Sequence, residues 1–195
     1  MEAMLFKAIR VAREAHKDQK RKFSQEPYII HPGRVAARLA IYGVGKFNNV
    51  ALNRMICAAW LHDVVEDTEW TKEDIEREFD SDIALMVDEL TNQFKKTDHP
   101  DKNRAERKKL EHIRLKEVSP KSKVIKAIDR IDNLLDVTVT AKKKWLLRYA
   151  DESQDLADKL AMPFRPVKKE HGGALPNDLH TQLLDTIAKA RASCQ

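Results

Sequence analysis

Four side chains able to bind a metal or transfer a proton stand together where an apolar run ends. They follow directly after Met55–Leu61 and are His62, Asp63, Glu66 and Asp67. On a continuous helix, residues four apart lie on one face, so all four side chains can point toward one small volume. Burying unpaired charges costs several kcal/mol per ion, and a divalent cation would offset that cost. The spacing therefore indicates a metal site.

The same residues permit a simpler interpretation, in which the helix ends at Leu61 and residues 62–67 form a solvated acidic turn. The apolar pair Val64 and Val65 speaks against it, because this pair lies between the acidic residues and indicates that one side of the segment stays buried. This segment alone leaves both interpretations open.

A second set of polar residues interrupts the apolar pattern of a later predicted helix. Its members are Asp129, Asp132, Asn133 and Asp136. Their spacings of three, four and seven place them in one stripe beside the apolar face of that helix. Such a stripe is typical of a solvated face, but together with residues 62–67 it offers a carboxylate ligand from a second helix.

His31 is a third candidate, because it precedes Pro32 at a predicted helix start, where the direction of a side chain is well defined. A lone histidine there is typical of a surface or capping residue. The basic cluster Lys20–Lys22 would by itself be a solvated loop. Followed by Pro27-Tyr28 and His31, it is unusual for a loop without a function.

The remaining histidines are predicted to be surface residues; they are His16, His99, His112, His171 and His180. A dinuclear metal site would need extra histidines between residue 63 and Asp129. Two of these five lie in that interval, His99 and His112.

The elements that must position these residues are predicted to be helices throughout. Apolar positions recur with helical spacing, and no alternating run is long enough for a strand, so we expect an all-α fold. The pattern predicts a first helix that ends before Lys17, and later helices near residues 31–43, 55–61, 71–79, 83–90, 105–118, 124–135, 141–160 and 178–195.

Two helix starts carry recognisable signals, and a third segment predicts a linker. Thr71 to Asp74 matches a capping box, and Asn177 or Asp178 is expected to cap the last helix. The stretch 162–177 holds three prolines and two glycines, which is typical of a linker. We therefore expect one helical bundle over residues 1–161, followed by a linker and a C-terminal helix over residues 162–195.

Composition bounds the function classes. The 195 residues are 42% hydrophobic and 34% charged, as in a soluble globular protein. The five glycines include one G-x-G, Gly43-Val44-Gly45, and no P-loop motif, which disfavours a dinucleotide or P-loop fold. A phosphate would therefore be bound by side chains or a metal. The formal charge of +5 is spread along the chain and does not by itself indicate nucleic acid.

Two further features predict the compartment. Cys57 and Cys194 match no zinc spacing, which favours free thiols in a reducing compartment. The first residues contain no uninterrupted apolar run of the kind found in signal peptides, and no stretch of eighteen apolar residues follows. We expect a cytoplasmic protein without a membrane partner.

The order His31, His62-Asp63, Asp129 resembles the H…HD…D pattern of the HD-domain metal-dependent phosphohydrolases. Two longer segments resemble the hydrolase domain of the RelA/SpoT-type alarmone enzymes and their small stand-alone relatives. The first comprises Arg21-Lys22, Glu26–Pro32 and Arg34–Ala36, and the second is Ala58–Thr68. The resemblance extends from about Leu5 to Leu160.

The resemblance implies a single HD-domain helical bundle with a metal centre. The implied ligands of one Mn²⁺ are His31, His62, Asp63 and Asp129. A mixed nitrogen and oxygen donor set suits Mn²⁺ or Fe²⁺ better than a thiolate-preferring metal, and Zn²⁺ is also compatible. The residues implied to position and activate the attacking water are Glu66 and Asp67.

The resemblance also implies the substrate, guanosine tetra- or pentaphosphate (ppGpp or pppGpp), from which the 3′-pyrophosphate is removed to give GDP or GTP. The implied nucleotide contacts are Arg21 and Lys22, and Asn133 lies near the base. Two residues depart from the family pattern: Asp132 stands in place of a histidine, and Phe23 in place of a small residue.

These departures keep other substrates open. The first alternative is an HD phosphohydrolase of another nucleotide, such as ppApp, a 5′-nucleotide, a dNTP or NADPH. The second is a nucleotide sensor or nucleic-acid-binding module that uses the surplus of basic residues. Because the whole implied ligand set is present, we favour an enzyme over this module. A homo-oligomer is compatible with the hydrolase and with each alternative.

Overall fold

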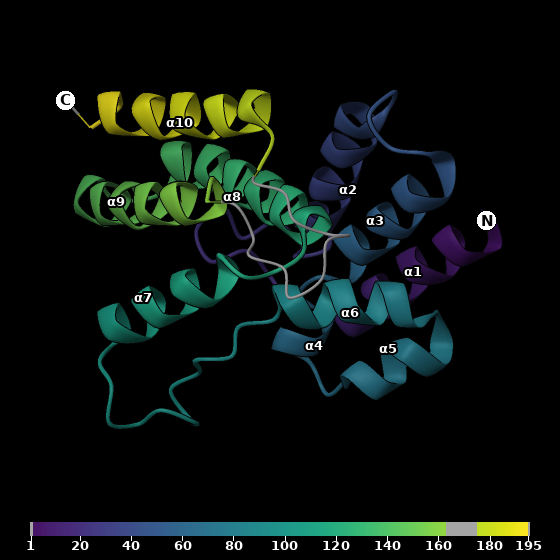
Figure 1. Cartoon of the computed structure of the whole chain (residues 1–195). Coiled ribbons are helices and arrows are strands. Elements are labelled where there is room, and N and C mark those ends of the chain that lie inside the picture. The colour runs from purple at the N-terminus through teal and green to yellow at the C-terminus, as the bar shows by residue number, and fades with distance from the viewer. Residues whose placement is uncertain (1, 163–174, 195) are drawn as a thin grey trace. The chain divides into compact units, whose positions relative to one another are not determined.

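The computed structural model describes residues 2–162 and 175–194, and their regular secondary structure is entirely helical (Figure 1). The β-type pairing within these residues is limited to one antiparallel bridge between Lys20 and Pro27. The predicted all-α fold is confirmed. The chain divides into two compact units, Met1–Thr91 and Asn92–Gln195, and each is described by itself.

The first unit is organised around its third helix. Its helices are α1 (Glu2–Ala15), α2 (Ile30–Gly43), α3 (Asn49–Leu61), α4 (Val64–Asp67), α5 (Lys72–Glu78) and α6 (Ser81–Leu90). Helix α3 packs against α1, α2 and α6. Its successive residues Cys57, Ala58 and Ala59 are fully buried, so the C-terminal half of α3 is surrounded by the core on several sides. The position of α3 sets where the chain leaves the core after Leu61.

Local signals explain where the neighbouring elements begin and end. The predicted capping box is confirmed, because Thr71 Oγ1 accepts from the Asp74 amide at 3.1 Å and Asp74 Oδ2 accepts from the Thr71 amide at 3.0 Å. Helix α2 ends at Gly43, where an added Cβ would overlap a methyl group of Leu52. A glycine there allows α2 and α3 to approach closely.

The second unit consists of α7 (Arg104–Leu115), α8 (Pro120–Thr140), α9 (Lys143–Leu160) and α10 (Asn177–Ala192). Helix α9 packs against α7 and α8, and α10 packs against both α8 and α9. The α10 side chains Leu179, Leu183 and Ile187 are buried. The C-terminal helix is therefore part of the core of this unit. The predicted domain boundary at residue 161 stays a prediction.

The start of α10 differs from expectation. Pro176, with φ −55° and ψ 137°, takes the cap position, and no side chain caps the helix. The expected cap by Asn177 or Asp178 is wrong, because the proline places both residues inside the first turn, where Asp178 Oδ1 accepts from the amide of Leu179 at 2.9 Å. Most of the predicted linker, residues 163–174, lies outside the described residues, as does His171.

Two of the histidines predicted to lie on the surface are buried. His16 is 1% exposed and packs against the ring of Tyr28, with a centroid distance of 4.9 Å. His112 is 2% exposed and pairs with Asp155. The surface prediction is wrong for both, because the His16 ring packs against Tyr28 and bonds to Gln19, and the His112 ring pairs with Asp155 of α9.

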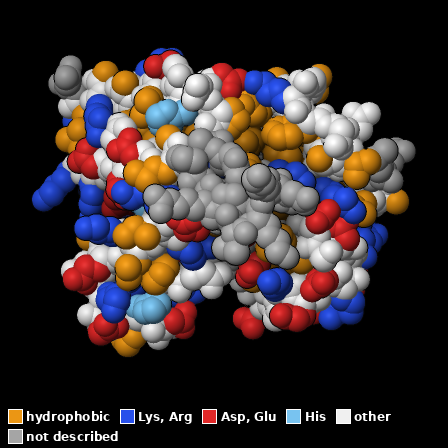
Figure 2. All heavy atoms as spheres, in the orientation of Figure 1, with side chains coloured by type: hydrophobic (Ala, Val, Ile, Leu, Met, Phe, Trp, Pro, Cys, Tyr) orange, Lys and Arg blue, Asp and Glu red, His pale blue; other side chains and the backbone are white. Residues whose placement is uncertain are grey.

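The surface carries mixed charge. On the face drawn in Figure 2, Lys and Arg side chains alternate with Asp and Glu and form no single positive field. Among the described residues, every helix is too short or too polar to span a membrane.

Candidate metal centre

Three metal-binding side chains meet in the first unit. His31 comes from the first turn of α2, and His62 and Asp63 follow the end of α3. One ligand atom from each of these residues lies within 4.8 Å of the other two. Both imidazole rings are 1% exposed, and their centroids are 5.2 Å apart. Residues 31 positions apart in the chain thus form one compact donor group.

The local backbone combines the two interpretations of residues 62–67. Helix α3 ends at Leu61, His62 and Asp63 form a turn, and a single helical turn, α4, begins at the buried Val64. A continuous helix through this segment is wrong, because Asp63 takes φ −100° and ψ −5°, which breaks the helical path. A fully solvated turn is also wrong, since Val64 returns to the core.

Hydrogen bonding orients the His62 ring. Its Nδ1 lies 2.8 Å from the carbonyl oxygen of Ala59, which can only accept, so Nδ1 carries the proton. The other nitrogen, Nε2, lies 3.0 Å from Asp63 Oδ2, and His31 Nε2 lies 3.8 Å from the same oxygen. In a neutral ring, the Nε2 lone pair faces a carboxylate, an arrangement that a cation between them stabilises. The donor set therefore fits a divalent metal.

Tyr28 supports this group from behind. Its hydroxyl donates to Asp63 Oδ2 at 2.7 Å, and its ring packs against His16. Outer partners of this kind fix the orientation of a metal ligand. From the sequence, Pro27-Tyr28 is conspicuous only as a rigid step before His31, and nothing in the sequence indicates that its hydroxyl reaches Asp63.

Glu66 and Asp67 lie on α4, one turn beyond Asp63. The pKa of Asp67 is raised to about 6, chiefly by burial and then by the neighbouring carboxylates of Asp63 and Glu66, although part of the side chain reaches solvent. A bound cation would lower this pKa, since it stabilises the carboxylate. The side-chain amide of Gln19 donates to the Asp67 carbonyl at 3.0 Å and ties α4 to the loop before α2.

The two predicted substrate contacts in the loop between α1 and α2 differ in burial. Arg21 is 7% exposed, with its guanidinium 5.6 Å from the Tyr28 ring centroid. Lys22 is exposed, and its ammonium lies 5.4 Å from the centroid of Phe23. The loop is anchored by the Arg21 amide, which donates to the Glu26 carbonyl at 2.8 Å. Arg21 thus shares Tyr28 with the metal centre, whereas Lys22 faces solvent.

The remaining predicted site residues lie on α8 in the second unit. Asp129 is 4% exposed and Asp132 is 1% exposed, so a solvated stripe does not describe them. Lys126 Nζ lies 2.9 Å from Asp129 Oδ2, and the Asn133 amide donates to Asp129 Oδ1 at 2.5 Å. Asp129 is therefore a buried carboxylate already surrounded by donors.

A basic cluster in the second unit was not predicted from the sequence. A cavity of about 190 Å³ is lined by Phe94, Lys95, Lys96, Arg104, Arg107 and Lys108, among others. Several cations around one cavity favour a bound anion such as a phosphate. The signal in the sequence that could have indicated this cluster is the density of lysine and arginine around it.

The HD-domain family model matches residues 8–163. The chain belongs to the HD-domain family. In this HD-domain chain, the dipeptide His62-Asp63 lies at the end of α3, where two further donors, His31 and the Tyr28 hydroxyl, reach the same carboxylate region.

Curated relatives of the HD-domain chain carry a common name. This chain is 35% identical over 144 residues to the guanosine-3′,5′-bis(diphosphate) 3′-pyrophosphohydrolase MESH1 of Xenopus tropicalis. The matched region covers 73% of this chain and 74% of the relative. This chain is 32% identical over 151 residues to the MESH1 protein of Drosophila melanogaster, over 77% and 78% of the two chains.

A solved structure gives the same relationship. It is described as "A metazoan ortholog of SpoT hydrolyzes ppGpp and plays a role in starvation responses", and it matches the HD-domain chain with a TM-score of 0.76 and 27% identity. The match covers 97% of this chain and 96% of the other.

Proposed function

We propose that this HD-domain chain hydrolyses ppGpp and pppGpp at the 3′-pyrophosphate. Water adds to the phosphorus next to the ribose, the bond from that phosphorus to the 3′-oxygen breaks, and the 3′-oxygen gains a proton, so that GDP or GTP and pyrophosphate are released. The observation that carries the proposal is the donor group of His31, His62 and Asp63 in a chain similar to named 3′-pyrophosphohydrolases.

The proposed metal is Mn²⁺, with Fe²⁺ and Zn²⁺ as alternatives, and the proposed ligands are His31, His62, Asp63 and Asp129. When bound, such an ion polarises a phosphoryl oxygen and lowers the pKa of a bound water. The two imidazoles and the carboxylate of the first unit support this assignment through their mixed nitrogen and oxygen chemistry. For Asp129, the support is its place in the H…HD…D order and its burial.

Two carboxylates are proposed to handle the attacking water. Asp67 takes a proton from it, and Glu66 orients it; both lie on the helical turn that follows the His62-Asp63 pair. Tyr28 has a positioning role, because its hydroxyl holds Asp63 Oδ2 at 2.7 Å. Gln19 holds the Asp67 backbone in a similar way.

The substrate contacts are proposed from the family pattern. Arg21 and Lys22 would offset phosphate charge, and Asn133 would lie near the base. The basic cavity beside Lys95 and Lys96 supports a polyanionic substrate. Asp132 is buried where the family pattern has a histidine, and this difference bears on the preference for guanine. The alternative substrate is ppApp, a 5′-nucleotide, a dNTP or NADPH.

The test is a substrate panel with the Mn²⁺-loaded protein, scored for pyrophosphate against phosphate release. We expect pyrophosphate and GDP from ppGpp, and loss of both in His62→Ala and Asp63→Asn. Matched controls are His180→Ala on α10 and Asp88→Asn on α6, which lie outside the proposed site and should keep wild-type rates. Release of single phosphates from 5′-nucleotides, with none of the panel giving pyrophosphate, would contradict the proposal.

The wider assignments are proposals as well. We propose a hydrolase domain over residues 1–161, with a linker and C-terminal helix over residues 162–195, acting in the cytoplasm on a small nucleotide substrate. Homo-oligomers are compatible with it. We assign no nucleic-acid or membrane partner.

A further inference from the structure

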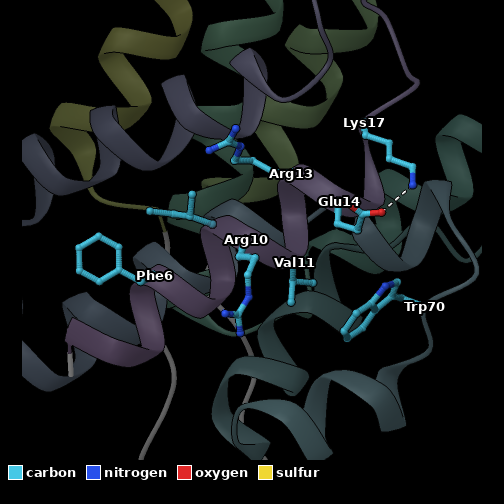
Figure 3. Close-up of a pocket in the computed structure, with 8 residues that line it drawn as sticks. Phe6, Arg10, Val11, Arg13, Glu14, Lys17 and Trp70 are labelled. Atoms are coloured by element: carbon cyan, nitrogen blue, oxygen red, sulfur yellow. Dashed lines mark hydrogen bonds and ion pairs between the residues drawn. The ribbon is translucent and has the colours of Figure 1, made fainter.

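A groove on the first unit lies outside the proposed hydrolase residues. Its volume is about 840 Å³, and it is lined by Phe6, Ile9, Arg10, Val11, Arg13, Glu14, Lys17 and Trp70 (Figure 3). All but Trp70 belong to α1 or directly follow it, and none is a proposed metal ligand or substrate contact. Small-molecule sites commonly have volumes of about 300–1,000 Å³. The groove is therefore large enough for a ligand of its own.

The charge of the groove is positive. Arg10, Arg13 and Lys17 follow one another at spacings of three and four, which places them in one stripe along α1. Lys17 pairs with Glu14 at 2.6 Å, and Glu14 is the one acidic residue of the lining. Within residues 2–162 and 175–194, neither Arg10 nor Arg13 makes an ion pair. Both guanidinium groups line the groove, and Figure 3 shows the Arg10 and Arg13 side chains leaving α1 in different directions, so Arg10 is the one beside Phe6.

The apolar part of the groove includes two aromatic rings. Phe6 is 62% exposed, and Trp70 is half-buried. Figure 3 shows the Arg10 side chain extending into the space between Phe6 on one side and Val11 with Trp70 on the other. Phe6 and Trp70 line the same groove as Arg10, so an anion bound by Arg10 has aromatic surface within the same cavity.

We propose that this groove binds a nucleoside polyphosphate, distinct from the molecule hydrolysed at the metal centre. Guanidinium groups match phosphate oxygens with paired, charge-assisted hydrogen bonds. Aromatic side chains offer a stacking face to any nucleobase. An acidic peptide would satisfy the arginines but leave the rings without a planar partner, and a volume of this size suits one small molecule better than a protein surface.

The test uses GDP as the probe, because GDP lacks a 3′-phosphate and is not hydrolysed by the proposed reaction. GDP is titrated into the full chain by calorimetry, with tryptophan fluorescence as a second readout. The test variant is Arg10→Glu, and the matched control is Lys144→Glu, which reverses one exposed charge on α9. An Arg21→Ala chain separates the groove from GDP bound as product at the metal centre.

We expect Arg10→Glu to weaken the GDP site that persists in Arg21→Ala by at least tenfold, and Lys144→Glu to change it by less than twofold. The rate of ppGpp hydrolysis without added GDP should be the same in Arg10→Glu as in the wild type. In Trp70→Leu, the fluorescence change on binding should be lost. Because GDP binding is the readout for the groove, the affinity and fluorescence results do not depend on the proposed hydrolase activity.

Several outcomes would overturn the proposal. GDP affinity that is unchanged in Arg10→Glu, or GDP binding that disappears entirely in Arg21→Ala, would show that the groove is not a nucleotide site. Inorganic pyrophosphate binding as tightly as GDP would remove the role of the rings. Polyglutamate binding in the absence of GDP binding would identify an acidic-protein surface instead. Arg10→Gln, with circular dichroism of each variant, separates loss of binding from loss of fold.

Discussion

Each unit of this HD-domain chain holds a buried histidine beside a carboxylate, and the two environments differ. In the first unit, the oriented His62 ring points Nε2 at Asp63, and His31 approaches the same carboxylate oxygen. Tyr28 donates to that oxygen as well. Two imidazole nitrogens and a hydroxyl therefore surround the same oxygen, Asp63 Oδ2.

In the second unit, His112 forms a pair and not a cluster. Its Nδ1 lies 2.6 Å from Asp155 Oδ2, while its buried Nε2 has no hydrogen-bond partner within the described residues. The pKa of His112 is lowered to about 4, chiefly by burial and then by the nearby Arg130 charge, and Asp155 opposes both effects. Lys108 and Lys109 line the cavity beside it. Asp151, Glu152 and Asp155 line the same cavity, so the charge around His112 is mixed.

A buried histidine beside an aspartate therefore occurs in two different settings in this chain. What distinguishes the first environment is a third donor from another helix and a second layer that fixes the carboxylate. At His112, burial and the nearby charges of Arg130 and Lys108 instead favour a neutral imidazole. Substitutions in the two regions should therefore affect different properties.

The largest expected effect is on metal content and activity. His62→Ala removes one of three converging donors, so we expect loss of bound Mn²⁺ after dialysis and at least about a 10³-fold fall in ppGpp hydrolysis, as several kcal/mol of metal-dependent stabilisation are lost. His112→Ala should keep the metal stoichiometry. Metal analysis by mass spectrometry with steady-state rates gives both numbers. A chain that loses its metal through His112→Ala alone would reverse the comparison.

The next effect is on acid stability. The pKa of His112 in the folded state is about 4, below its ordinary value of 6.5, so the unfolded chain takes up a proton first as the pH falls. The wild type should therefore be fully stable above pH 6.5 and lose about 3 kcal/mol of unfolding free energy between pH 6.5 and 4.

His112→Gln cannot take up this proton, and its amide can still donate to Asp155. Over the same interval its urea-unfolding free energy should fall by about 3 kcal/mol less than that of the wild type. Parallel pH profiles for the two proteins would contradict the assignment of a neutral, buried His112.

A smaller effect is expected from the second layer of the metal centre. Tyr28→Phe removes the hydroxyl that donates to Asp63, and loss of such a partner commonly costs about tenfold in metal affinity or activity. Titration of metal-free protein with Mn²⁺ measures the affinity. Tyr42→Phe is the matched control, because Tyr42 lies on α2 away from the donor group and its ring can still contact Lys46. Equal affinities for the two variants would exclude the positioning role of Tyr28.

The smallest effect concerns Asp67 in metal-free protein. Its folded pKa of about 6 lies above its ordinary value of 3.8, so the folded state holds the proton more tightly, and stability falls as the pH rises through 6. Asp67→Asn should be more stable than the wild type at pH 8 by about 1 kcal/mol, a value reduced by solvent contact, and should match it near pH 4.

Urea unfolding in EDTA measures this difference, and Asp158→Asn on α9 serves as the control. A wild type that is the more stable of the two at pH 8 would show that the Asp67 carboxylate is stabilised by its surroundings rather than destabilised.

Much of the fold follows from local signals. Helical periodicity predicts the all-α architecture, and the Thr71–Asp74 spacing predicts a cap that the structure contains. The errors lie where tertiary contacts override local preference. The turn at Asp63 interrupts a helix because Val64 returns to the core, and His16 is buried because Tyr28 packs over it.

The candidate site divides in the same way. Residue type and order single out His31 and the His62-Asp63 pair, because imidazoles and carboxylates in a mostly apolar setting require a compensating partner. The α1 groove and the basic cavity near Lys95 have no such signal. Their members are ordinary surface residues, and only packing places Trp70 beside α1.

The sequence by itself determined the chemistry of this protein: helices throughout, a histidine-aspartate donor set, and too few glycines to hold a phosphate by backbone alone. Tertiary structure decided which donors meet. The rings of His31 and His62 lie close together because α2 and α3 pack against each other. The His62 ring is oriented by the hydrogen bond from its Nδ1 to the Ala59 carbonyl of α3. Spacing along a chain constrains neighbours within a helix, whereas contact between helices depends on the whole core.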